Sequence, residues 1–338
     1  MIEFLIMKLD YALYQNPKLI TVFGGSGFVG RHVVETLTKR GYRVRIAVRC
    51  PQKAYYMLQI GEVGQTQMLK TDVRNYASVK HALFGADGAV FLPGSLAQTN
   101  KPNFQNIQVD GTKNVSELTA KAGIPLIYMS TLITDENASF SYARTKAISE
   151  QIVRNTHSQA VIMRSSVIFG PEDYFFNFLA NLSRFMPIMP LFGGGQNKLQ
   201  PVYVGDIAKF VVYALEKRVI LGKNYDLGGP KVLTFENTLE EILKVIHRKK
   251  RTFPVPLAIG FFIGGFFGAL GKLPFFPTLI TANQIRFLQK DHIVSQEAKD
   301  NGYTLEGVGI TPKSITAILP SYLWRFRPQG QFSHNLSI

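Results

Sequence analysis

A tyrosine and a lysine four residues apart, Tyr142 and Lys146, could together move a proton to or from a carbonyl group. On a helix this spacing places both side chains on one face. A neighbouring ammonium lowers the pKa of a phenol, so the tyrosine could transfer the proton while the lysine holds a ribose. Ser130 and Thr131 end a predicted strand, from which a hydroxyl could orient the carbonyl. These four residues are the candidate catalytic group, and an ordinary surface helix is the alternative.

Three glycines, Gly24, Gly27 and Gly30, follow an apolar run at three-residue intervals. The first two would let the backbone turn tightly against a pyrophosphate, and Gly30 would let a helix pack close to the strand. Phe28 and Val29 belong to the same turn, at the helix start that would face the phosphates. A glycine triplet alone is weak evidence, but here it joins a strand to a helix. We therefore predict a dinucleotide-binding loop.

Arg49, at the end of the second predicted strand, favours NADP(H) over NAD(H). NAD sites usually carry an acid at this point, whereas an arginine can hold a 2'-phosphate. Lys53 lies close by, and no acid occurs between Gly41 and Lys53. Asp72 ends the third predicted strand and could either reach the adenine amino group or form a turn. An ordinary surface role for Arg49 is the alternative.

The elements that would position these residues alternate between strand and helix. Strands are expected at 18–23, 43–48, 67–72, 88–92, 125–130 and 161–169, with helices after the glycine loop and at 75–83 and 103–122. Such alternation predicts an α/β fold, a Rossmann-like, doubly wound parallel sheet covered by helices on both faces.

Four parts are expected along the chain. They are an N-terminal extension over 1–17, a nucleotide-binding Rossmann domain over 18–170, a smaller C-terminal lobe over 171–330 that is interleaved with the last sheet elements, and a tail over 331–338. Strict alternation stops after Gly170. Two prolines and three glycines within 187–195 predict a long loop there, and a helical pattern returns at 206–216.

Composition excludes several classes of protein. Of the 338 residues, 46% are apolar and 18% are charged, which excludes global disorder. The net charge of +15 is spread along the chain and favours polyanionic surroundings, such as nucleic acid, anionic lipid or an acidic partner.

Cys50 is the single cysteine, so no internal disulfide can form, no metal site is expected, and a reducing compartment fits best. The apolar patch at 4–7 is too short for a secretory signal, so the chain is expected to stay where it is made or to arrive already processed.

These features together resemble the short-chain dehydrogenase/reductase superfamily, in its extended or atypical branch. A closer resemblance is to a family of dehydrogenase-like accessory subunits of respiratory complex I, subunit nine of the alpha subcomplex, and their alphaproteobacterial relatives. Five blocks in the same order carry it, at 167–177, 190–195, 200–208, 227–235 and 319–328. The resemblance implies a tightly held NADPH outside the main electron path, in a protein that stabilises the junction of the peripheral and membrane arms near the quinone site. It also implies a peripheral location, on the cytoplasmic face of a bacterial inner membrane or on the matrix side in an organelle.

Three positions depart from the pattern of the superfamily. Phe23 stands where threonine is usual, Gln108 replaces the asparagine of N-V-x-G-T, and Ser165 follows Arg164 where proline is usual. The asparagine change removes a common active-site group, whereas the glycine loop is intact, so we expect nucleotide binding without turnover. Two other functions stay open, an NADP-dependent reductase or epimerase acting on a hydrophobic or quinone-related substrate, and a quinone-biosynthesis or ubiquinone-binding factor.

A basic run at 248–251 precedes twenty uncharged residues from Thr252 to Gly271. Two prolines interrupt its start, and only 257–270 is continuously compatible with a helix. Basic residues near an anionic leaflet favour binding to it, so we expect 248–271 to lie at an anionic membrane surface or against a membrane subunit. A buried helix of the lobe and a transmembrane helix are the alternatives. The chain carries no RNA-binding or helix-turn-helix motif, so no nucleic-acid partner is expected.

Overall fold

The computed structural model of the protein describes residues 17–94, 104–136, 138, 141–217, 221–270, 285–287 and 289–330. The expected extension, except for residue 17, and the expected tail at 331–338 lie outside these residues. The chain divides into two compact units of three segments each. Unit 1 contains Met1–Ser130, Thr145–Arg164 and Ile207–Tyr225, and unit 2 contains Thr131–Arg144, Ser165–Asp206 and Asp226–Ile338. The expected boundary at Gly170 lies near one of the five points where the chain passes between the units.

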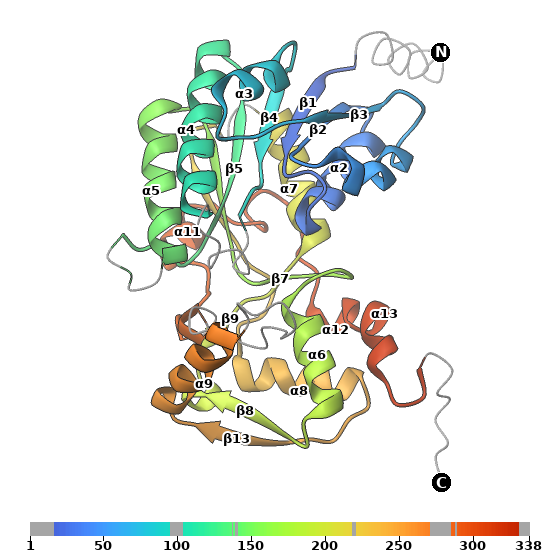
Figure 1. Ribbon diagram of the computed structural model, residues 1–338, viewed down its shortest axis with the longest axis vertical. Helices are drawn as coiled ribbons and strands as arrows, with labels where there is room; N and C mark the ends of the chain where they lie inside the picture. The colour runs from blue at the N-terminus through green and yellow to red at the C-terminus, as the bar shows by residue number, and fades with distance from the viewer. Residues whose placement is uncertain are drawn as a thin grey trace. The chain divides into compact units, whose positions relative to one another are not determined.

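Unit 1 is built on a seven-stranded sheet (Figure 1). In spatial order its strands are β11 (Asn224–Leu227), β6 (Val161–Ser165), β5 (Leu126–Thr131), β4 (Gly88–Phe91), β1 (Leu19–Phe23), β2 (Arg43–Val48) and β3 (Thr66–Lys70). The pairs β1–β2, β2–β3, β1–β4 and β4–β5 run parallel. The order reverses between β1 and β4, so the loops after these two strands open at the same edge of the sheet. The predicted Rossmann-like fold is confirmed.

Helices cover both faces of this sheet, as Figure 1 shows. Those on or beside it are α2 (Phe28–Lys39), η1 (Pro51–Gln59), α3 (Tyr76–Leu83), α4 (Phe104–Ala122), α5 (Ser141–Thr156) and α7 (Val204–Glu216). Residues of α3, α4 and α5 share one apolar cluster with the sheet, including Val79, Val115 and Val153. Because both faces are covered, all five residues of β1 are buried. The one polar residue among them, Thr21, donates its hydroxyl to Ala82 O at 2.8 Å.

Unit 2 combines short strand pairs with helices around a second apolar core. The strand pairs are β7 (Ile168–Phe169) with β10 (Val202–Tyr203), β9 (Lys198–Leu199) with β12 (Leu233–Thr234), and β8 (Ile188–Phe192) with β13 (Arg251–Val255). The helices are α6 (Phe175–Phe185), η3 (Gly193–Gly195), α8 (Phe235–Val245), α9 (Leu257–Leu270), α11 (Gln296–Asp300), α12 (Ile315–Ile318), α13 (Pro320–Leu323) and η5 (Trp324–Phe326). In the core, Phe176 and Leu179 of α6 belong to one cluster with Leu239 and Ile242 of α8.

Two local predictions were wrong in unit 2 and at its border. The predicted loop at 187–195 contains β8, which pairs in parallel with β13. Its partner lies some sixty residues further along the chain, so local residue types could not reveal the pairing. Both strands carry a proline, Pro190 and Pro254, which a pair of two strands tolerates better than the centre of a sheet does. The single strand predicted at 161–169 is two strands, β6 and β7, in different sheets.

The apolar segment also divides. Its first residues belong to β13, and the helix α9 spans Leu257–Leu270, the stretch that the sequence marked as helix-compatible. Among the residues that the structure describes, no helix combines the length and hydropathy needed to cross a bilayer.

A buried carboxyl group ties the end of the chain to the start of α6. Asp173 accepts hydrogen bonds from the backbone N–H groups of Phe176 at 2.6 Å and Gly170 at 3.2 Å. It also accepts the Tyr322 hydroxyl from α13 at 2.7 Å. Burial raises the pKa of Asp173 to about 6, although these hydrogen bonds favour the carboxylate.

The stability of unit 2 should therefore fall as the pH rises through about 6. The folded pKa lies above the unfolded value of about 3.9, so folding favours the protonated acid, and its contribution of up to about 3 kcal/mol is complete only below pH 4. Asp173→Asn should lack this slope, because asparagine can still cap the helix but cannot ionise. The fluorescence of Trp324, the only tryptophan, reports urea unfolding of this unit.

Glu172→Gln is the matched control, since this neighbouring side chain is exposed. It should keep the wild-type slope between pH 4 and 7. Equal slopes in wild type and Asp173→Asn would contradict the assignment.

Candidate functional site

The glycine loop follows β1 and has the backbone geometry that its spacing predicts. Gly24 adopts a positive φ of 76° and donates its N–H to Ala47 O at 3.1 Å. Gly27 donates its N–H back to Gly24 O at 3.0 Å, which closes the turn. A Cβ on Gly30 would lie 2.4 Å from Gly24 O. Only glycine therefore lets α2 pack this closely against the end of the strand.

The start of α2 forms a cradle that fits a pyrophosphate. Gly27 is the N-cap and so provides no capping side chain, and no acid lies in the first turn. The N–H groups that begin the helix, among them those of Phe28 and Val29, are thus available to an anion and carry the positive end of the helix dipole. A Cβ on Gly27 would find only Gly24 O within 4 Å, at 3.3 Å, so the space in front of the loop is open.

The predicted adenosine-binding residues lie along the ends of β2 and β3. Arg49 and Lys53 are both exposed, Arg49 just after β2 and Lys53 in η1. The helix η1 is tied to the glycine loop, because Tyr56 donates its hydroxyl to Ser26 O at 3.1 Å. Both residues predicted to bind the 2'-phosphate thus lie on the segment after β2, the strand beside β1.

Asp72 carries a partner that the sequence analysis missed. Arg74 donates two hydrogen bonds to its carboxylate, from Nε at 3.0 Å and from NH2 at 2.7 Å. These bonds, and more weakly the charge of Arg49, hold the pKa of Asp72 below its usual range. The spacing Asp-x-Arg at the start of a loop was the only sequence signal. Arg74 therefore adds a second exposed guanidinium close to Asp72.

Lys146 is buried in unit 1, with 3% of its surface exposed. Its Nζ donates to Met129 O at 2.8 Å and lies 5.3 Å from the centre of the Tyr128 ring. Burial lowers the pKa of Lys146 to about 7, and the opposing charge of Glu150 offsets only part of that effect. Glu150 is itself bound by Arg164 through Nε at 3.1 Å.

Gln108 extends this buried network. With its amide oriented to satisfy both ends, its nitrogen donates to Pro93 O at 2.9 Å, and its oxygen accepts from Tyr128 at 2.8 Å and Lys146 at 3.2 Å. Gln108, which stands where the superfamily usually has asparagine, thus still places an amide at the site, because its longer side chain reaches Lys146. A Cβ on Gly94, after β4, would lie 3.0 Å from Lys146 Nζ, and its φ is +141°. A glycine at this point thus lets the backbone pass directly beside the amine.

The other predicted catalytic residues lie at the ends of β5 and α5. Ser130 and Thr131 are buried at the end of β5, with 3% and 4% of their surfaces exposed. Tyr142 is on α5, four residues before Lys146, and packs edge-on against Phe287 with ring centres 6.0 Å apart. Tyr142 is half-buried, and this burial raises its pKa to about 12. This direction is opposite to that expected of an activated phenol.

Residues 20–228 match the model of the family described as NAD dependent epimerase/dehydratase. A mouse protein, NADH dehydrogenase [ubiquinone] 1 alpha subcomplex subunit 9, mitochondrial, is 32% identical over 250 residues, which are 73% of this chain and 66% of its own length. The Arabidopsis thaliana protein of the same name is 30% identical over 92% of this chain and 78% of its own. The alignment with the plant protein extends well beyond the family match.

A solved structure, dTDP-glucose 4,6-dehydratase DesIV from Streptomyces venezuelae with NAD and TYD bound, has the same fold. It superposes with a TM-score of 0.67 at 18% identity, over 91% of this chain and 96% of its own. This superposition shows the same fold, and the family match over residues 20–228 confirms the predicted superfamily resemblance.

The buried amine should make unit 1 more stable as the pH rises from about 7 to 10. The folded pKa of Lys146 lies below the unfolded value of about 10.4, so the unfolded chain binds the proton more tightly in this range. Lys146→Met should therefore lose this rise in the free energy of unfolding. Urea unfolding followed by far-UV circular dichroism at pH 7.0 to 9.5 measures it.

Lys113→Met is the matched control, since Lys113 is exposed on α4. It should retain the wild-type pH dependence. If Lys146→Met shows the same rise as wild type and this control, the amine is not buried as described.

Proposed function

The chain belongs to the NAD dependent epimerase/dehydratase family, and on this premise we propose that it holds NADP(H) as an accessory subunit of respiratory complex I. One observation carries the proposal. Similarity to subunits named for NADH dehydrogenase continues through 92% of the chain, whereas the family match ends at 228. The C-terminal lobe is thus shared with complex I subunits and not only with enzymes of the family.

The glycine loop and its neighbours support the nucleotide part of the proposal. Gly24, Gly27 and the first residues of α2 would hold the pyrophosphate. Arg49 and Lys53 would hold the 2'-phosphate, joined by Arg74, which lies beside Asp72. When bound, the nicotinamide supplies a site for hydride transfer. Lys146 would lie near the nicotinamide ribose, with Gln108 and Met129 O fixing its direction.

The buried network supports nucleotide binding without catalytic turnover. A lysine activates a phenol by its positive charge, and burial favours the neutral amine of Lys146. Burial likewise disfavours the phenolate of Tyr142. Both shifts make proton transfer through this pair less favourable than it would be for a charged lysine beside a phenol of lowered pKa. The chain therefore fits a protein in which the nucleotide stabilises structure.

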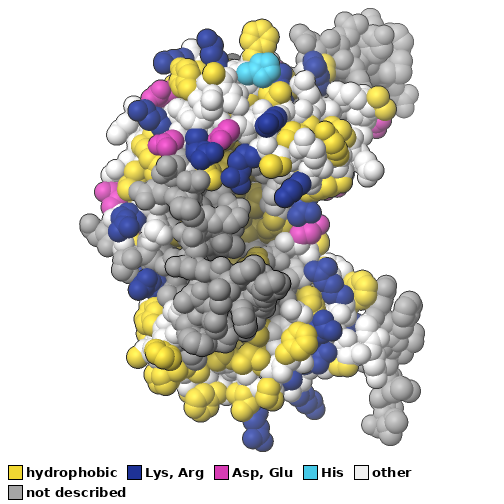
Figure 2. Space-filling model, viewed as in Figure 1, with side chains coloured by type: hydrophobic (Ala, Val, Ile, Leu, Met, Phe, Trp, Pro, Cys, Tyr) yellow, Lys and Arg dark blue, Asp and Glu magenta, His cyan; other side chains and the backbone are white. Residues whose placement is uncertain are grey.

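An apolar rim in unit 2 supports a peripheral membrane location. It consists of Ile188, Phe253, Leu257, Ile259 and Phe262, which expose between 37% and 77% of their surfaces. Figure 2 shows hydrophobic side chains over β8, β13 and α9, with Lys and Arg beside them. An exposed apolar face with adjacent cations is typical of proteins that lie on anionic lipid. We place this face on the cytoplasmic side of a bacterial membrane or the matrix side in an organelle, near the ubiquinone that the relatives' names specify.

A second function, an NADP-dependent reductase or epimerase, is favoured by one observation. Tyr142 and Lys146 are both retained at the spacing that carbonyl chemistry uses. Binding of a nucleotide could in this case reverse the charge preferences of the pair. The two functions differ in whether Tyr142 is needed.

Arg49→Asp should weaken NADPH binding about 10- to 100-fold, the range expected for loss of a hydrogen bond between charged groups. NADH affinity should stay equal or rise, because an acid at this position can bind the ribose hydroxyls. Titration of nucleotide fluorescence measures both constants. Arg43→Asp is the control, since this exposed residue opens β2 at its other end and should leave the ratio unchanged. An unchanged ratio in Arg49→Asp would contradict the 2'-phosphate role.

The tagged full chain, purified from detergent-solubilised membranes of its own cells, should bring complex I subunits and NADP(H) with it. Tyr142→Phe should recover the same subunits and nucleotide, because the accessory role does not use the phenol. Mass spectrometry identifies both.

A chain recovered free of complex I would overturn the proposal. Turnover of NADPH with a small carbonyl compound that Tyr142→Phe abolishes would establish the reductase instead.

A further inference from the structure

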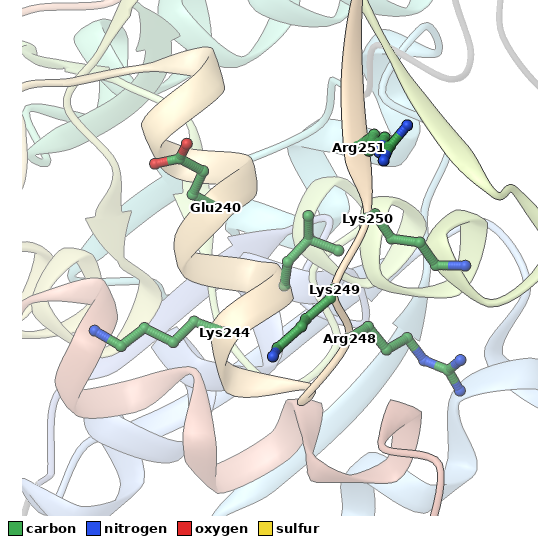
Figure 3. A pocket seen from close by; sticks show the side chains of 7 residues that line it. Glu240, Lys244, Arg248, Lys249, Lys250 and Arg251 are labelled. Carbon is green, nitrogen blue, oxygen red and sulfur yellow. The ribbon is translucent and has the colours of Figure 1, made fainter.

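An open basic pocket lies at the carboxyl end of α8 (Figure 3), with a volume of about 470 Å³. Five cations, one acid and one leucine line it, namely Glu240, Leu243, Lys244, Arg248, Lys249, Lys250 and Arg251. Figure 3 shows Lys249 beside the end of α8, with Lys244 on the helix and Lys250 on the opposite side of the strand. Within the described part of the chain, none of the five cations forms an ion pair with a carboxylate. Among the described residues, five cations and a single carboxylate, that of Glu240, thus line the pocket.

A tight backbone turn fixes the position of Arg248, the first residue of the basic run. His247 adopts a positive φ of 55°, and its N–H donates to Lys244 O at 3.2 Å. The next N–H, that of Arg248, donates to Leu243 O at 3.0 Å. These two bonds form a Schellman motif, in which glycine or asparagine is the usual residue with positive φ. The basic run therefore starts from a defined turn at the end of the helix.

The segment that contains Phe326 and Arg327 forms two hydrogen bonds with the same turn. Arg248 Nε donates to Phe326 O at 3.0 Å, and Arg327 Nε donates to Val245 O at 3.0 Å. The run then continues into β13, whose first residue, Arg251, pairs with Ile188 of β8. Backbone order on both sides reduces the conformational entropy that the cations lose when they bind a ligand.

The pocket adjoins the apolar rim along one strand. Ile188, beside Arg251 in register, is 49% exposed, and Phe253, two residues further along β13, is 59% exposed. In a strand, residues two apart point to the same face. A dissolved anion would gain nothing from this apolar neighbour, whereas a lipid presents a phosphate beside its acyl region. The juxtaposition favours a lipid as the source of the anion.

We propose that the pocket at the end of α8 binds the phosphodiester of an anionic phospholipid while the apolar rim enters the acyl boundary. The inference rests on the membrane location in the proposed function and adds to it a headgroup site. Lys249, beside the end of α8, would meet the phosphate, and Lys250, on the opposite side of the strand, would add to the attraction of the anionic surface. Arg248 Nε already donates to Phe326 O. The ligand class is a glycerophospholipid with net negative charge, for which phosphatidylglycerol is the probe.

The full chain is titrated with vesicles of phosphatidylcholine containing phosphatidylglycerol, and with phosphatidylcholine vesicles alone. Trp324 is the reporter, because it lies two residues before Phe326. Lys249→Gln/Lys250→Gln should weaken binding to the anionic vesicles roughly 10- to 30-fold. The control, Lys80→Gln/Lys113→Gln, removes the same charge from exposed positions on α3 and α4 and should weaken it less than about threefold.

Each other result is informative. If wild type binds no anionic vesicles, the membrane location fails and the headgroup site fails with it. If wild type binds and both double variants weaken equally, only the headgroup site fails. Saturable quenching of Trp324 by inorganic phosphate alone, without a preference for anionic vesicles, would assign the pocket to a free anion.

A protein partner gives a separate result. If Lys249→Gln/Lys250→Gln binds vesicles as wild type does but loses complex I on purification, the pocket binds an acidic protein segment and the lipid proposal is overturned. The variant Phe253→Ser/Phe262→Ser tests the rim independently and should lose vesicle binding while the lysines are intact.

Discussion

The close approach of α2 to the end of β1 is the constraint on which the rest of the nucleotide site depends. A helix start leaves N–H groups without partners, and these groups attract anions only if nothing of the protein occupies the space before them. Gly30 permits the approach, because any side chain there would collide with Gly24 O. Gly27 keeps the cradle open, and η1 is held against the loop by Tyr56. The sheet order brings the loop after β4 to the same edge, where Gly94 passes beside Lys146.

The two units carry their charges in opposite ways. In unit 1 a lysine is buried, satisfied by Met129 O and Gln108, and biased toward its neutral form. In unit 2 the cations at the end of α8 stay at the surface without carboxylate partners among the described residues. Burial thus lowers the pKa of the lysine in unit 1, and exposure preserves charge beside an apolar rim in unit 2. Both arrangements fit a protein whose role is to bind and to assemble.

Local patterns in the sequence predicted the fold and the cradle because each depends on neighbouring residues. The bounds of β2 and of α9 follow directly from alternation and from helix compatibility. The predictions that were wrong depend on residues far apart in the sequence, such as those of β8 and β13, which meet only in the folded chain. Gln108 was interpreted as a loss, since its contact with Lys146 requires knowledge of Pro93 and Tyr128. The raised pKa of Tyr142 was missed for the same reason, because spacing indicates proximity but not burial.

The most direct test of the account is calorimetric titration of the nucleotide-free full chain with NADPH, in wild type and in Gly27→Ala. The added methyl group would meet one protein atom, Gly24 O at 3.3 Å, which needs a shift of a few tenths of an ångström, and it would stand where the pyrophosphate would lie. The account predicts one NADPH per wild-type chain and a large loss of affinity in a variant that still unfolds cooperatively. Wild type that binds no nicotinamide nucleotide, or a variant that binds as tightly as wild type, would contradict it.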